Sequence, residues 1–95
     1  MRNYELVLIL SPEVADENVS ATVGRVSQFI TDRGGSVTKV DEWGRRRLAY
    51  PINRFTEGIY VLAQYQMEPK ITSELESSLH LNEEVLRHLL VRLDN

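Results

Sequence analysis

The hydrophobic positions of the chain change their spacing several times, and the first pattern is a short apolar run from Tyr4 to Leu10 that ends at Ser11-Pro12. A run of this length is too brief for a helix and is typical of a strand. Side-chain alternation puts one row on each side of that strand. One row is apolar throughout and the other is mixed: Tyr4, Leu6, Leu8 and Leu10 against Asn3, Glu5, Val7 and Ile9.

Two later segments have helical spacing. The first runs from about Asp16 to Arg33 and is followed by Gly34-Gly35, a common helix stop. Its apolar residues recur every three or four positions: Val19, Val23, Val26 and Ile30. The second follows Pro69, which a first helical turn tolerates, and has apolar residues at intervals of four: Ile71, Leu75 and Leu79. Both patterns predict amphipathic helices.

Three further strands are predicted by their apolar and β-branched residues. They cover 37–50, 59–67 and 85–93. Gly44 interrupts the first of these strands and indicates a bulge or a sharp bend, and Pro51 indicates either the end of this strand or an edge position. The segment 53–58 is rich in turn-forming residues and predicts a connector between two paired strands.

The predicted order is strand, helix, strand, strand, helix, strand. Two such units with right-handed crossovers place both helices on one face of a four-stranded antiparallel sheet. We therefore expect an α+β chain with the ferredoxin-like split βαβ fold. A length of 95 residues supports one hydrophobic core, so we expect a single domain over residues 1–95.

The helices of such a fold leave the other side of the sheet uncovered. If the more uniformly apolar rows face the helices, the opposite side still carries apolar residues from three strands. They are Val7, Ile9, Tyr60, Leu62, Leu89 and Val91. A collection of this size suggests an interaction surface. The alternative is ordinary exposed apolar area, because more than half of a typical protein surface is apolar.

The residues that the chain lacks exclude several kinds of functional site. The chain has no cysteine, which excludes disulfides, thiolate metal sites and a cysteine nucleophile. It has no glycine-rich phosphate loop and no nucleophile beside a plausible base, so neither an enzyme nor a bound cofactor is expected.

His80 and His88 are interpreted as structural or solvent-facing, and no metal site is predicted. Trp43 and Tyr65 are interpreted as packing residues rather than as stacking platforms for a base. The short N-terminal apolar run predicts no membrane span and no signal peptide, which favours the cytoplasm.

Charge is distributed unevenly. The net charge of -3 and the pI of about 5.3 argue mildly against a nucleic-acid partner. Locally, however, Arg45, Arg46 and Arg47 stand close to Tyr50, and Arg54 follows. Forked guanidinium donors suit phosphate, and a ring offers a base a surface for stacking. The alternative is a solvated arginine run that guards a strand edge or pairs with nearby acids such as Asp41 and Glu42.

A resemblance to a known protein family bears on the choice between an RNA-binding and a merely solvated arginine run. The stretch Gly44-Arg-Arg-Arg-Leu-Ala-Tyr-Pro-Ile52 resembles the most distinctive segment of the bacterial small-subunit ribosomal protein six family, and so does the opening Met1-Arg-Asn-Tyr-Glu5. The similarity extends over the whole chain, including Leu86-Arg-His-Leu89. It implies a ferredoxin-like fold without catalysis. It also implies a component of the 30S subunit that binds the central domain of 16S ribosomal RNA during assembly, as a heterodimer with ribosomal protein eighteen.

The resemblance also suggests roles for residues. The RNA contacts are expected among seven arginines: Arg2, Arg45, Arg46, Arg47, Arg54, Arg87 and Arg92. For Arg2, Arg87 and Arg92 the alternative is plain solvated arginine. For Arg45, Arg46, Arg47 and Arg54 the alternatives are contact with the partner protein or with acids of the same chain. The partner-protein interface is expected on the six apolar residues of the uncovered face named above. Two other hypotheses remain open at this point: a small ligand-sensing or catalytic domain, because many activities share this fold, and a homo-oligomeric module that uses the uncovered face.

Overall fold

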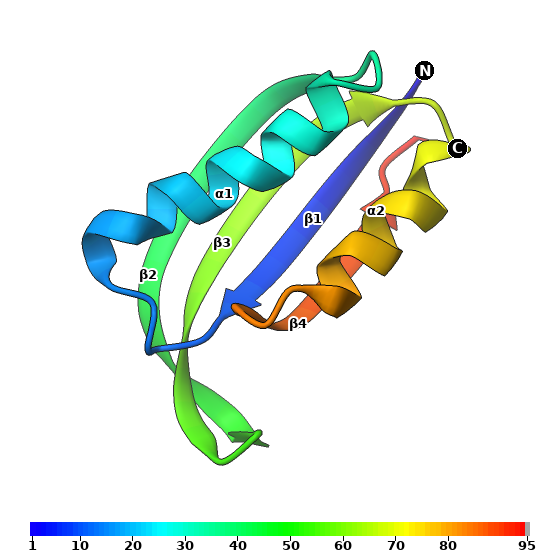
Figure 1. Cartoon of the computed structure of the whole chain (residues 1–95). Helices are drawn as coiled ribbons and strands as arrows, with labels where there is room; N and C mark the ends of the chain where they lie inside the picture. Colours follow the sequence, from blue (N-terminus) through cyan, green and yellow to red (C-terminus); the bar gives the residue numbers. More distant parts are fainter. Residues whose placement is uncertain (95) are drawn as a thin grey trace.

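The computed structural model describes residues 1–94. In chain order the elements are β1 (Arg2–Leu10), α1 (Asp16–Thr31), β2 (Ser36–Ile52), β3 (Phe55–Met67), α2 (Ile71–Leu81) and β4 (Val85–Arg92). The strands form one antiparallel sheet in the order β2-β3-β1-β4, and both helices lie on the same side of it (Figure 1). The predicted ferredoxin-like fold is confirmed.

The core lies between the helices and the apolar row of the sheet. Leu6 stands opposite Ala63 of β3 and Leu90 of β4, and Leu8 stands opposite Val61 and His88. The helices contribute the rest of the same buried cluster: Val19, Val23, Val26 and Ile30 from α1, and Ile71, Leu75 and Leu79 from α2. The helical spacing of the sequence therefore marks the residues that face the sheet. None of the helices in residues 1–94 is long and apolar enough to span a membrane.

Tyr65 is a buried packing residue, as predicted. Its hydroxyl lies 3.1 Å from the Ser27 hydroxyl of α1, so the one polar atom of the ring has a partner inside the core. Burial raises the pKa of the Tyr65 phenol, and the Ser27 hydrogen bond offsets part of this effect. The phenol therefore stays neutral at physiological pH.

The hairpin between β2 and β3 is longer than predicted, and the expected six-residue connector is wrong. Strand β2 continues through Pro51 to Ile52, and β3 already begins at Phe55. Only Asn53 and Arg54 form the turn, with φ angles of 49° and 74°. Two-residue hairpin turns require this left-handed conformation, and neither residue is the glycine that usually signals it. The tip of the hairpin consequently projects past the other two strands (Figure 1).

Gly44 lies at a bulge, as predicted. The pairing of β2 with β3 shifts between Glu42 and Gly44, and Gly44 has a φ of 85°, which other L-residues rarely adopt. A second shift separates Val37 from Lys39. Other ends differ slightly from the expected ones: α1 stops two residues earlier, α2 begins two residues after Pro69, and β4 ends at Arg92.

We predict that Leu8→Ala lowers the free energy of unfolding by about 2–5 kcal/mol, because it leaves a cavity in the middle of the core where the structure cannot collapse fully. Leu81→Ala is the matched control. This leucine is 79% exposed at the end of α2, so its removal should change stability by about 0.5 kcal/mol or less. Urea denaturation followed by circular dichroism measures both. Equal losses for the two variants would contradict the position of the core.

Candidate functional site

The face of the sheet opposite the helices carries the six apolar residues expected there. Val7 stands opposite Leu62 of β3 and Leu89 of β4. Ile9 stands opposite Tyr60. Val91 stands opposite Glu5 at the next position of the same row. Neither helix covers this side of the sheet, so the predicted uncovered face is present (Figure 1).

The uncovered face has an apolar centre and a polar end. The residues of β1 and β3 are partly buried by their neighbours in the sheet, whereas Leu89 and Val91 are 57% and 41% exposed. A shallow hollow lies among Val7, Ile9 and Leu89, with Arg87 at its side. Further along the strands the row becomes polar, where Gln64 donates a hydrogen bond of 3.1 Å to Glu5. Contact with an apolar partner surface is therefore possible at the centre and hydrogen bonding at one end.

The hairpin closes the other end of the uncovered face. Leu48 of β2 is only 8% exposed, although no helix covers it. A β-carbon on Gly58 would lie 2.6 Å from Ile9 Cγ2 and 3.6 Å from Leu48 Cδ2, so the missing side chain allows both to approach the β3 backbone. Arg87 of β4 donates a hydrogen bond to the Tyr50 hydroxyl, and its guanidinium lies 6.0 Å from the centre of that ring. The end of the hairpin is thereby joined to the opposite edge strand.

Within residues 1–94, Arg45 is the member of the arginine run whose side chain forms hydrogen bonds. Its guanidinium donates hydrogen bonds to the carbonyl oxygens of Pro12 (2.9 Å) and Val14 (3.1 Å) and to the carboxylate of Asp16 (3.2 Å). It also lies 3.8 Å from Glu57. The acids suggested as partners, Asp41 and Glu42, are not the ones it uses. Arg45 thus fixes the segment before α1 to β2, on the helix side of the sheet.

Arg46, Arg47 and Arg54 are exposed and form no side-chain hydrogen bond or ion pair within residues 1–94. Arg46 stands opposite Gly58, in the row of Tyr60 and therefore on the uncovered side. Arg47 stands opposite Glu57, and Arg54 is in the hairpin turn. The free guanidinium groups of the run are consequently gathered on and beside the hairpin.

The remaining three of the seven arginines lie on β1 and β4. Arg87 occupies the margin of the uncovered face through its contact with Tyr50. Arg2 and Arg92 lie at the far end of the sheet, opposite Met67 and Tyr4 respectively. Arg92 lies 3.6 Å from Asp94. Desolvation raises the pKa of the Asp94 carboxyl, but hydrogen bonds from Asn3 and the charge of Arg92 outweigh it, so that pKa is below its usual value. The seven arginines therefore do not form one continuous patch.

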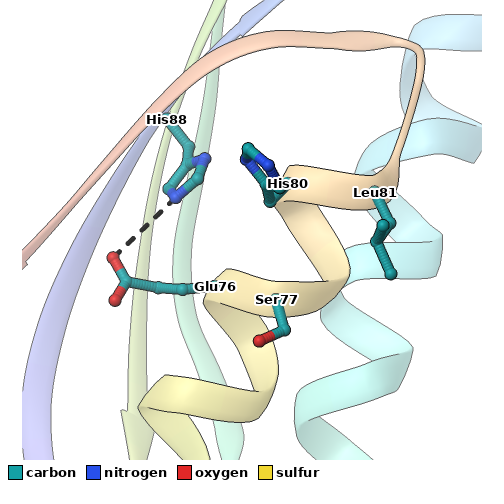
Figure 2. A pocket seen from close by; sticks show the side chains of 5 residues that line it. All are labelled: Glu76, Ser77, His80, Leu81 and His88. Atoms are coloured by element: carbon teal, nitrogen blue, oxygen red, sulfur yellow. Dashed lines mark ion pairs between the residues drawn. The ribbon is translucent and has the colours of Figure 1, made fainter.

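The histidines lie together in a pocket between α2 and β4. Glu76, Ser77, His80 and Leu81 of α2 line it with His88 of β4, and His88 Nε2 is 3.8 Å from a Glu76 carboxylate oxygen (Figure 2). The spacing of Glu76 and His80, four residues apart on one helix, is a sequence signal for this pocket that the sequence analysis missed. Among residues 1–94 no three histidine or acidic side chains could hold a metal ion. The pocket thus contains an ion pair that becomes charged on both sides only when His88 is protonated.

Comparison with known proteins agrees with this architecture. The model of the family described as Ribosomal protein S6 matches residues 3–92. A "Small ribosomal subunit protein bS6" of Desulforamulus reducens is 45% identical over 92 residues, covering 97% of both chains. That of Beutenbergia cavernae is 48% identical over 94 residues, covering 99% of this chain and 98% of its own. The crystal structure of 30S ribosomal protein S6 from Thermotoga maritima superposes with a TM-score of 0.90 at 32% identity, covering 97% of this chain and 87% of its own.

The fold, the uncovered face and these relatives define a structural protein of the small ribosomal subunit, a class without enzymatic activity. Within that class, the chain belongs to the Ribosomal protein S6 family. The family agrees with the expected location, the ribosome of the bacterial cytoplasm. It argues against the hypothesis of a small catalytic domain.

We predict that Arg45→Met lowers the free energy of unfolding by about 1–2 kcal/mol. The two carbonyl hydrogen bonds account for most of this loss, because ion pairs with exposed acids contribute little. Arg47→Met, which removes an exposed arginine without such contacts, should change stability by about 0.5 kcal/mol or less. Guanidinium chloride denaturation distinguishes the two variants, and an unaltered Arg45→Met protein would show that these contacts do not support the fold.

Proposed function

We propose that the chain binds the central domain of 16S ribosomal RNA as a heterodimer with ribosomal protein eighteen, and that this binding is its contribution to the small subunit. The observation that carries the proposal is the uncovered apolar face, with guanidinium groups at its margins on β2 and β4. Apolar surface favours a protein partner, and the guanidinium groups favour phosphate. The two kinds of contact are therefore adjacent on one side of the sheet.

The protein contact is assigned to the apolar centre of the face. Its members are Val7, Ile9, Tyr60, Leu62, Leu89 and Val91. Leu89 and Val91 have the largest exposed fractions of the six, so a partner has much of their side chains left to bury, and buried apolar side chains contribute most to such a contact. A net charge of -3 complements a basic partner, which would supply much of the positive charge that RNA binding needs.

The RNA contact is assigned first to the arginines at the hairpin. Arg47 and Arg54 are exposed and unpaired within residues 1–94, so they can approach phosphates without breaking an existing interaction. The Arg46 guanidinium is also exposed and lies 5.9 Å from the centre of the Trp43 ring. Arg87, at the same end of the uncovered face, can also bind a phosphate if its guanidinium gives up the hydrogen bond to the Tyr50 hydroxyl. Arg2 and Arg92 offer a second, smaller contact at the other end of the sheet. Arg45 contributes indirectly, by holding β2 in place.

We predict that Leu89→Asp abolishes or weakens binding of ribosomal protein eighteen by at least tenfold, because it places a charge in the middle of an apolar contact. Leu89 is largely exposed in the free chain, so the melting temperature should hardly change. Leu81→Asp introduces the same charge at the end of α2 and should bind normally. Isothermal titration calorimetry with the purified partner compares the variants. Loss of binding by Leu81→Asp with Leu89→Asp unaffected would place the interface on the helix side.

We predict that the double variant Arg47→Ser, Arg54→Ser weakens binding of the heterodimer to a transcript of the central domain and makes the binding less salt-dependent. Each lost phosphate contact should reduce the slope of log K against log salt by about 0.7–0.9. Arg25→Ser, Lys70→Ser removes the same charge from the helix side, where Arg25 is paired with Glu84, and should leave the slope unchanged. Filter binding at several salt concentrations measures both. Equal slopes for the two double variants would contradict an RNA contact at the hairpin.

A further inference from the structure

Trp43 is not a packing residue, contrary to its interpretation from the sequence. Its side chain is 45% exposed, which is unusual for the only tryptophan of a small chain. The register shows which side of the sheet it occupies: Asp41 stands opposite Leu62 and Gly44 opposite Tyr60, both in the row of the uncovered face. The Trp43 indole donates a hydrogen bond to Asp41 and lies near Arg46. Trp43 is therefore on the uncovered side of β2, as Asp41 and Arg46 are.

Two contacts and a backbone bulge set the position of the indole while leaving ring surface exposed. Its Nε1–H donates to Asp41 Oδ2 at 3.0 Å, which fixes the edge of the ring. The Arg46 guanidinium lies 5.9 Å from the ring centre, within the range of a cation-π contact. The bulge at Gly44 sets the direction of the backbone next to Trp43. A large aromatic ring with a satisfied N–H and an accessible face is suited to stacking.

From this geometry we propose that Trp43 is a stacking platform for an unpaired RNA base, with Arg46 as the neighbouring phosphate contact. The proposal rests on the proposed binding of ribosomal RNA and adds to it a place where a single-stranded nucleotide is held. Single-stranded RNA is commonly recognised by stacking of its bases on aromatic side chains beside arginine.

The surroundings of Trp43 favour a nucleotide over a protein side chain. Its neighbours on the same side of β2 are Lys39, Asp41 and Arg46, all charged, and a protein contact centred on the indole would have to bury them. A nucleotide can cover the indole without burying these charged side chains, because its base stacks on the ring while its phosphate stays in solvent. The Asp41 carboxylate repels phosphate, so the backbone of the RNA should lie toward Arg46.

The single tryptophan makes the proposal directly measurable. The test uses the full chain with ribosomal protein eighteen and a transcript of the central domain, and records tryptophan emission and its quenching by iodide before and after each component is added. The same complex with Trp43→Phe gives the background from the partner. We expect little change on adding the partner protein, then a loss of at least half of the Trp43 emission and of its access to iodide on adding RNA.

Affinity gives a second readout. Trp43→Ala should bind the transcript roughly fivefold to a hundredfold more weakly, and Trp43→Phe should recover most of the affinity, because base stacking depends on an aromatic face. Unchanged emission and unchanged affinity in a complex that still binds RNA would overturn the platform and leave the proposed function standing. Protection of Trp43 by the partner protein alone would overturn it in favour of a protein contact. A heterodimer that binds no RNA would overturn the proposed function itself and the platform with it.

Discussion

Two helices can cover only one face of a four-stranded sheet, and the rest of the molecule depends on this constraint. Every strand has two sides, and the chain places its uniformly apolar row toward the helices: Leu6 and Leu8 of β1 are fully buried there. The other row cannot be buried by the chain itself, yet it is not polar. Val7, Leu62 and Leu89 meet on it, and no further helix or strand within residues 1–94 covers them. The stability of the fold and the surface proposed to bind a partner thus arise from the two sides of the same strands.

The hairpin of β2 and β3 divides its charged residues between these sides. Arg45 faces the helices and holds the segment before α1 through two carbonyl oxygens. Its neighbour Arg46 stands opposite Gly58 on the uncovered side and lies near Trp43. Adjacent residues of one run therefore have different roles, the first in the fold and the second at the surface proposed to meet RNA. Because the hairpin also curls until Tyr50 reaches Arg87, it closes the end of the face on which the partner protein is proposed to sit.

The order of elements and the residues of the core could be predicted from the sequence, because the periods of two and of nearly four residues report directly which side chains face a common core. The uncovered face followed from the same alternation on β1, β3 and β4, whose central pairing is regular from Glu5 to Ile9. On β2 the residues do not alternate regularly between the two sides of the sheet. Register shifts at Val37/Lys39 and at Glu42/Gly44, with a third between Arg47 and Ile52, change which side successive residues face, so the positions of Trp43 and the arginines could not be counted from the start of the strand. The Asn53-Arg54 turn was missed because its left-handed backbone is formed without glycine.

The proposed function requires another protein to cover the uncovered face of the sheet. Cross-saturation NMR can locate this contact, with a deuterated, methyl-labelled chain bound to a protonated sample of ribosomal protein eighteen. Saturation should reach the methyl groups of Val7, Ile9, Leu62, Leu89 and Val91, while Leu81 on α2 keeps its full signal. Saturation of Leu81 and the helices, with the methyl groups of the bare side unaffected, would contradict the claim.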